Sequence, residues 1–144
     1  MNAKAAAKLY SPALLGLATG LADYPFDPAL QLVAETRSRS CGSVITIGVT
    51  MGEDNRIAQI GMKVSACAIG QASAALLAQS SIGAAPQHIA ATAQGLERWL
   101  SGAGDLPDWP GIAALAPARD HPGRHGALLL PWKAACEALS QAAT

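Results

Sequence analysis

The sequence predicts an α+β fold, in which a three-stranded antiparallel sheet has helices packed on one of its faces. Apolar and polar residues alternate over 44–50 and 57–65, and the intervening turn at 52–55 is rich in Gly, Asp and Asn, which is typical of a β-hairpin. After residue 66 the apolar residues recur with helical spacing. Because the strand segments precede most of the helical ones instead of alternating with them, an α+β architecture is favoured over a parallel sheet.

The N-terminal half is expected to hold one helix and the whole sheet. The helix covers Ala3 to about Ala22 and ends before two prolines, which remove backbone donors and favour extended conformations. Leu32 to Arg39 is predicted to be a weak strand at a sheet edge. The next strand directs Ile45, Ile47 and Val49 to one face, and its hairpin partner does the same with alternate apolar residues.

The C-terminal half is predicted to be helical. Helices are expected at about 66–79, at 86–101, where proline suits the first turn, and at about 128–142. Loops are expected at 102–111 and 118–126, with a single helical turn at 112–115 between them.

Length, charge and hydropathy limit the class of protein. A chain of 144 residues predicts a single domain, residues 1–144. Ten basic and ten acidic side chains give a net charge of zero, and the densest cationic pair is Arg37 with Arg39. Binding to a phosphate backbone needs several clustered cations, so nucleic acid is not an expected partner. No apolar segment approaches the length of a membrane span, so no membrane association is expected.

Three cysteines indicate the compartment. Cys41, Cys67 and Cys136 cannot form an even-numbered disulfide framework, so we expect a reducing, cytoplasmic location. The N-terminal segment loosely imitates a signal peptide, but its apolar run is short and it is spaced as one amphipathic helix.

Two of the cysteines are placed to meet at one edge of the sheet. Cys41 lies between the first and second strands, and Cys67 lies where the third strand gives way to a helix. In an antiparallel meander these positions are neighbours. Cys67 is expected in the first turn of its helix, where exposed N–H groups and the helix dipole favour a thiolate. The pair could handle sulfur or bind a soft metal, or it could be two small buried apolar residues. We expect Cys136 to be packed in the last helix.

Three segments of the sequence resemble a known family. They occur in the family's order and with compatible gaps, and the similarity is strong from residue 41 to residue 139. The segments are Cys41-Gly42-Ser43, Ala66-Cys67-Ala68-Ile69-Gly70-Gln71-Ala72-Ser73-Ala74 and Pro122-Gly123-Arg124-His125-Gly126-Ala127-Leu128-Leu129-Leu130-Pro131-Trp132-Lys133. The chain is similar to the SufU/IscU (NifU N-terminal-like) iron–sulfur cluster assembly scaffold family, in its SufU form.

The resemblance implies a SufE/NifU-like fold and a role in iron–sulfur cluster assembly. The chain would be a scaffold or a sulfur acceptor, and not a classical enzyme, working with a cysteine desulfurase of the SufS/IscS type. Cys41 and Cys67 would be persulfide acceptors and metal ligands. In the family, three cysteines and one aspartate surround zinc or a nascent iron–sulfur cluster, but here Ser43 takes the aspartate position and Ala127 that of the third cysteine. His125 is a candidate for the missing ligand.

Two alternatives remain open. The chain could be a metal-free regulatory or binding module that kept the fold and lost the cluster chemistry, which the residues at positions 43 and 127 favour. It could also be a thiol–disulfide protein that uses Cys41 and Cys67 as a redox pair, although no C-x-x-C motif supports this.

Overall fold

The structure, a computed structural model, describes residues 9–39 and 42–143. The predicted helix start at Ala3 and the predicted site residue Cys41 lie outside the described residues. The elements, in chain order, are α2 (Pro12–Gly20), η1 (Leu21–Asp23), β1 (Leu32–Arg37), β2 (Val44–Met51), β3 (Ile57–Ser65), α3 (Ala68–Ser81), α4 (Pro86–Leu100), η2 (Ile112–Asp120), η3 (Pro122–Arg124), α5 (His125–Ser140) and η4 (Gln141–Ala143), the η elements being 3-10 helices.

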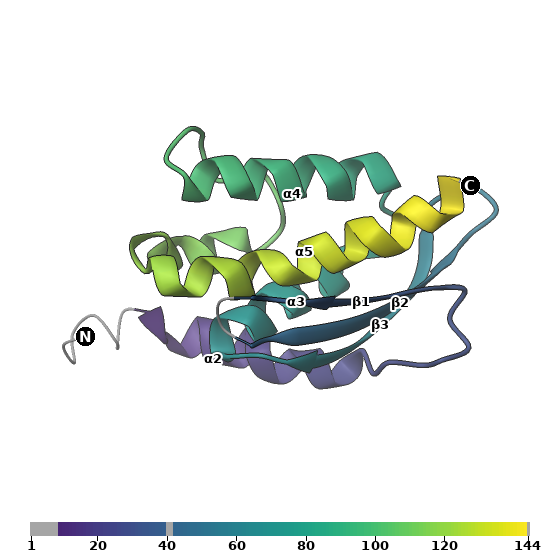
Figure 1. The fold of residues 1–144 in the computed structure, drawn as a ribbon, viewed down its shortest axis with the longest axis horizontal. Helices are drawn as coiled ribbons and strands as arrows, with labels where there is room; N and C mark the ends of the chain where they lie inside the picture. The colour runs from purple at the N-terminus through teal and green to yellow at the C-terminus, as the bar shows by residue number, and fades with distance from the viewer. Residues whose placement is uncertain (1–8, 40–41, 144) are drawn as a thin grey trace.

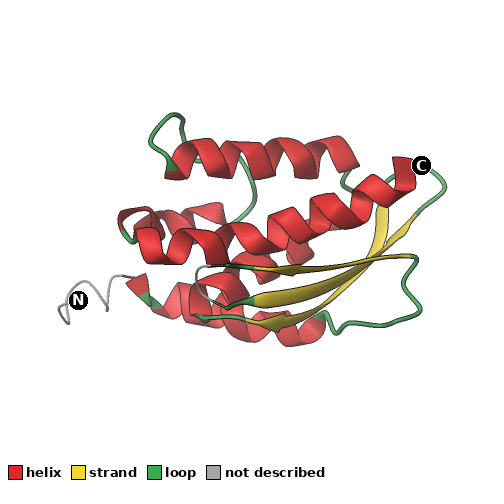
Figure 2. Cartoon of the chain, in the orientation of Figure 1, coloured by secondary structure: helices red, strands yellow, loops and turns green. Residues whose placement is uncertain are grey.

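The three strands form an antiparallel sheet in the order β1-β2-β3, and the helices pack in layers against it (Figures 1 and 2). Helix α5 lies over β1 and β2, and α3 contacts both β3 and α5. Helix α2 packs on α3, and α4 packs on α5, so these two outer helices lie at opposite sides of the molecule (Figure 1). The predicted α+β fold, with its small antiparallel sheet, is therefore confirmed.

The inner face of the sheet and the helices share one hydrophobic core. Ile45, Ile47 and Val49 of β2 are fully buried, as their alternation predicts. The alanine-rich stretch of α3 from 72 to 78 is also buried, which allows the helices to approach closely. Trp132 of α5 is the largest fully buried side chain.

A pair of glycines lets the segment that precedes β1 lie on the other face of the sheet. Gly48 and Gly61 are partners in the β2–β3 register. A Cβ at position 48 would meet the Leu30 side chain, and one at position 61 would overlap the carbonyl of Pro25. Tyr24 accepts a hydrogen bond from the backbone N–H of Met62 at 2.9 Å. Residues 24–30 therefore cover this face of the sheet around Gly48 and Gly61. They do not cover it near Val44, where β2 begins.

The strands and the helix at 86–100 match the sequence predictions closely, whereas the limits of the other helices differ. Helix α3 covers Ala68–Ser81 in place of about 66–79. In place of one helix up to residue 22, α2 starts at Pro12, because Ser11 accepts a hydrogen bond from Leu14 N–H and caps it. The segment predicted as a loop at 118–126 contains the end of η2 and all of η3, and α5 begins at His125. The expected single turn at 112–115 continues as 3-10 helix to Asp120.

Candidate functional site

The site is built where β2 begins and β3 ends. Val44 pairs with Ser65, so the residues just outside this pair are brought together. The turn before β2 is closed by a hydrogen bond of 2.9 Å from Ser38 N–H to the carbonyl of Ser43. Gly42 has a φ of 71°, a left-handed conformation that glycine adopts without steric cost. This geometry gives a physical reason for the glycine in the segment that resembles the family.

Cys67 was expected in the first turn of α3. It is instead the N-cap residue of this helix. Its backbone is extended, with φ −66° and ψ 172°, and its carbonyl accepts the N–H of Gln71 at 3.0 Å. The side chain of Gln71 donates a hydrogen bond of 2.9 Å from Nε2 to the carbonyl of Ala66 and so fixes the backbone just before the helix. The Cys67 side chain makes no capping hydrogen bond, so the half-buried thiol is not used to hold the helix end.

The first turn of α5 packs directly on the first turn of α3. A Cβ built on Gly70 would lie 3.4 Å from the Cβ of Ala127 and 2.7 Å from that of Ala66. Only a glycine fits between these two alanines without displacement. The contact brings position 127 to the same place as Cys67, although 60 residues separate them in the sequence.

An open cavity of about 280 Å³ lies between these three segments, and we call it the Cys67 hollow. Cys67 and both family ligand positions, Ser43 and Ala127, line it, and Ser43 and Ala127 are 4% and 1% exposed. The remaining lining residues are Gly42, Ser65, Ala66, Gly123 and Arg124. The structure therefore brings together positions 43, 67 and 127.

The other predicted site residues are placed differently. Arg124, which matches the family arginine, is half-buried and lines the hollow. His125 is not among the lining residues, and its Nε2 atom lies 2.8 Å from the carbonyl oxygen of Arg119. That nitrogen is therefore already used for a backbone hydrogen bond.

Cys136 lies far along α5, between α5 and α4, and does not line the hollow. It is a free, half-buried thiol, in agreement with its expected packing role. Burial is the main cause that raises its pKa, and the negative charge of Glu97 raises the pKa further. A thiol with a raised pKa is mostly protonated at neutral pH and is a weak nucleophile.

The described residues do not fit a zinc ion or an iron–sulfur cluster without help. A stable zinc site needs four nitrogen, sulfur or oxygen ligands. Within residues 9–39 and 42–143 no group of three or more His, Cys, Asp or Glu side chains is placed to hold a metal ion. The described lining of the hollow provides one thiol, the hydroxyl groups of Ser43 and Ser65 and the methyl groups of Ala66 and Ala127 as the side chains beside Arg124. What it can do chemically is expose one sulfur atom beside a guanidinium group.

Comparison with solved structures shows close neighbours for this fold. A nitrogen-fixing NifU-like protein (N-terminal) from Brucella abortus is 27% identical, with a TM-score of 0.86, over 95% of this chain and 96% of that one. A protein assigned as an iron–sulfur cluster assembly scaffold of the SUF system, from the thermophile Fervidobacterium islandicum AW-1, is 22% identical, with a TM-score of 0.83, over 92% and 98% of the two chains. No protein-family model matches the sequence, and no curated protein matches it.

Fold and site together define a small α+β protein with a half-buried thiol, that of Cys67, at the junction of sheet and helix. The resemblance of this chain to the SufU and NifU N-terminal-like family is thereby confirmed. In the part of the chain that the structure describes, no helix is long and apolar enough to cross a membrane.

Sequence reasoning did not identify Ser65, Ala66 or Gly123 as lining residues of the hollow. Ser65 and Ala66 directly precede Cys67, so the predicted strand end already located them. Gly123 had no comparable signal, because the segment before α5 was expected to be an irregular loop and is a 3-10 turn.

Proposed function

We propose that this chain is a sulfur-acceptor or scaffold protein of iron–sulfur cluster assembly that works with a cysteine desulfurase. One observation carries the proposal: Cys67, the N-cap residue of α3, has a free, half-buried thiol and lines a hollow that also contains family positions 43 and 127. The similarity to a NifU-like protein and to a SUF-system scaffold supports the same role. Cys41 is proposed as the second acceptor, on the family resemblance alone.

The proposed chemistry is transfer of one sulfane sulfur. The Cys67 thiolate attacks the outer sulfur of a persulfide on the partner, a new S–S bond forms on Cys67, and the partner's S–S bond breaks. The partner's cysteine leaves as a thiolate, so no external oxidant or reductant is needed. The helix dipole of α3 and the cation of Arg124 both favour negative charge in the hollow.

Sulfur acceptance is favoured over stable metal binding because it requires one accessible thiolate and not four ligands. Zinc or a nascent cluster would need donors beyond the described lining of the hollow. Even with Cys41 added, the family positions of this chain provide two thiols. We therefore treat a cluster as cargo that would need further ligands, and we assign no step to it.

Persulfide loading tests the proposal. The purified protein is incubated with a cysteine desulfurase and L-cysteine under anaerobic conditions, and the modified cysteine is located by mass spectrometry. We expect Cys67 to gain the mass of one sulfur atom, and Cys67→Ser to lose that signal. Cys136→Ser is the matched control, because this thiol lies outside the hollow and its pKa is raised.

Loading that stays unchanged in Cys67→Ser would remove this residue as the acceptor. If neither Cys67 nor Cys41 is modified by the desulfurase or by inorganic polysulfide, the sulfur-acceptor function is wrong. Zinc and iron per chain, measured on the same anaerobic sample, are expected to be well below one.

A second function is favoured by the incomplete ligand set: a metal-free regulatory or binding module that occupies the surface of a desulfurase. Ser43 and Ala127 in the hollow support this alternative. It differs from the first in one outcome, since such a module binds the desulfurase without accepting sulfur.

The remaining expectations stay predictions. A thiol–disulfide protein would oxidise Cys41 with Cys67, and a titration of free thiols after mild oxidation tests that possibility. A cytoplasmic location and a carrier or scaffold role, in place of classical enzyme activity, follow from the proposed function.

A further inference from the structure

A second cavity lies between the N-terminal half of α5 and the end of β1. Its volume is about 360 Å³, at the lower end of the range found for small-molecule sites. Arg39 and Lys133 line it and no acidic residue does, and we call it the cationic hollow. Arg37 also borders it, but its side chain pairs with Glu35 on the opposite, exposed face of the sheet. The lining of this hollow includes Thr36, Arg37, Arg39, Gly126, Leu130 and Lys133.

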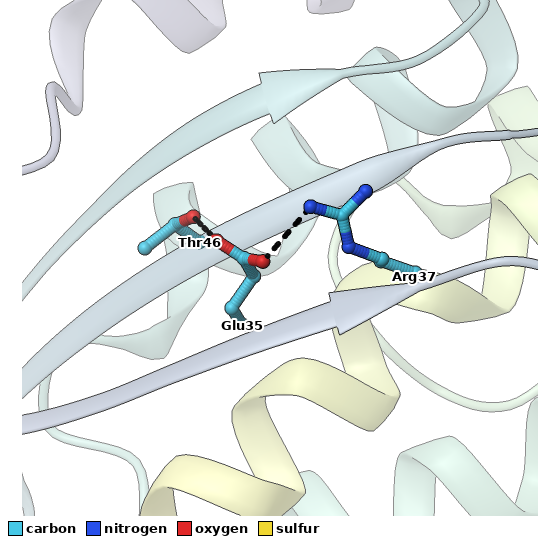
Figure 3. Close-up of polar contacts among 3 residues, drawn as sticks. All are labelled: Glu35, Arg37 and Thr46. Carbon is cyan, nitrogen blue, oxygen red and sulfur yellow. Dashed lines mark hydrogen bonds and ion pairs between the residues drawn. The ribbon is translucent and has the colours of Figure 1, made fainter.

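The cations are not held in strong ion pairs. Arg37 reaches Glu35 at 3.3 Å, and Glu35 also accepts a hydrogen bond from Thr46 on the exposed face of the sheet (Figure 3). Lys133 lies 3.9 Å from Glu97, with both side chains more than half exposed. Exposed pairs of this kind contribute little free energy, so either cation can turn to another anion. Arg39 has no ion-pair partner within residues 9–39 and 42–143.

A buried hydroxyl provides the second, independent observation. Thr36 follows Leu32 and Ala34 on the inner face of β1, where α5 covers the strand. Its Oγ1 atom is buried and has no hydrogen-bond partner among the described residues. A buried hydroxyl without a partner loses the free energy of a hydrogen bond. An acceptor oxygen in the hollow that Thr36 lines would restore it.

The backbone adds charge of the same sign. Gly126 is in the first turn of α5, a helix of 16 residues, whose N-terminus carries the positive end of the dipole. Lys133 lies two turns further along the same helix, and Arg39 follows the end of β1. Charges from two separate elements therefore surround one small cavity.

We infer that the cationic hollow binds a small dianion through its oxygen atoms, either a phosphate group or a dicarboxylate. Arg39 and Lys133 would neutralise its charge and the Thr36 hydroxyl would donate to one of its oxygens. The inference is independent of sulfur transfer, because no cysteine of the described residues lines this hollow.

NMR titrations of the full chain at low ionic strength test the inference, with inorganic phosphate in one arm and succinate in the other. Sodium chloride at equal ionic strength is the reference for screening. We expect saturable shifts of the Thr36 and Gly126 amides, with a Kd of about 1 mM or tighter for at least one of the two anions. The arm that binds tighter identifies the phosphate or the carboxylate as the preferred group.

Four substitutions, one of them a control, sharpen the test. Arg39→Gln and Lys133→Gln are each expected to raise the Kd at least about fivefold. Lys63→Gln is the matched control, since this lysine is exposed on β3 and does not line the hollow. The Kd of this variant for the anion is expected to stay within about twofold of that of the unaltered protein. Thr36→Val removes the hydroxyl at nearly constant volume. It is expected to raise the melting temperature of the free protein and to weaken anion binding.

The inference is overturned if neither anion gives saturable shifts beyond those of chloride, or if Lys63→Gln weakens binding as much as Lys133→Gln. Binding of an acidic protein through Arg39 and Lys133, without binding of either small anion, would also overturn it. A melting temperature for each variant confirms that it is folded.

Discussion

Helices α3 and α5 meet at two places that differ sharply in chemistry. At the first, Ser73 of α3 donates a hydrogen bond of 2.6 Å to the carbonyl of Leu128 and accepts one of 3.0 Å from Nε1 of Trp132. All of these side chains are buried. At the second, one turn nearer the N-terminus of α3, Gly70 meets Ala127, and the thiol of Cys67 opens into a hollow.

The difference shows how one helix pair can be rigid and reactive at the same time. Every polar atom in the buried contact has its partner, so that contact fixes how the two helices lie. The small residues at the other place contribute little contact area, and they leave the sulfur accessible. The rigid contact therefore positions the open one.

Replacing Trp132 is expected to have the largest effect on stability. The side chain is fully buried and packs edge-to-face on Trp109, with ring centroids 5.0 Å apart. Trp132→Ala is expected to lower the free energy of unfolding by about 3–5 kcal/mol. Urea denaturation followed by circular dichroism measures this loss.

Trp132→Phe serves as the companion variant if Trp132→Ala does not fold. It keeps most of the apolar volume and removes the N–H donor, so a smaller loss is expected. Loss below about 1 kcal/mol in Trp132→Ala would mean that this contact does not fix the helices.

Ser73→Ala is expected to have the second largest effect. The substitution leaves the buried Nε1 of Trp132 without an acceptor, which costs about 1–3 kcal/mol. Ser140→Ala is the matched control, because the Ser140 hydroxyl is exposed and bonds only to the carbonyl of Glu137 in its own helix. A control that loses as much stability as Ser73→Ala would contradict the role of the buried hydrogen bonds.

The sheet was predictable from sequence because its signals are local. Alternation over 44–50 and 57–65 predicted the hairpin, and its register then predicted that positions 41 to 44 lie near positions 65 to 67. The prediction that Cys67 lies at this edge needed nothing beyond the strand period and a helix start. Cys41 lies outside the described residues, so its half of that prediction stays open.

The rest could not be predicted because it depends on contacts between distant segments. Whether Ala127 meets Cys67 is decided by the packing of Gly70 against α5, and the sequence gives no local sign of that contact. The early start of α5 at His125 also depends on the 3-10 turns before it, and these turns place the His125 ring on the carbonyl of Arg119. The cationic hollow similarly joins β1 to α5.

Restoring the family ligand types is expected to change metal content while altering stability less than the first two substitutions. Positions 43 and 127 both line the hollow, so Ser43→Asp with Ala127→Cys adds a carboxylate and a thiol beside Cys67. With Cys41 as the family's other ligand, the set reaches four, and about one zinc per chain is expected. Metal analysis of the anaerobically purified double variant measures this gain.

The matched control adds Cys67→Ser to the double variant and is expected to lose the zinc. Zinc that persists in this triple variant would show that the metal is held elsewhere. A double variant without zinc would mean that the three segments around the hollow are not placed to coordinate one ion.

The smallest effect is expected at the third cysteine, which tests the contrast between an open and a packed thiol. Glu97 raises the pKa of Cys136 in addition to the larger effect of burial. Glu97→Gln is therefore expected to lower this pKa and to speed alkylation of Cys136 by iodoacetamide at pH 8 by no more than about threefold, because the Glu97 side chain is half exposed and screened. Alkylation of Cys67 in the same sample serves as the internal reference and is expected to stay unchanged.

The sign of the pH dependence follows from the same shift. Because folding raises the pKa of Cys136, the folded state favours the protonated thiol, and this contribution to stability is complete below the pKa of the unfolded chain. It is lost as the pH rises through the higher pKa of the folded state. Cys136→Ala removes this contribution, so its free energy of unfolding is expected to fall less steeply at alkaline pH than that of the unaltered protein. An identical slope in both proteins would mean that Cys136 is not the thiol whose titration opposes folding.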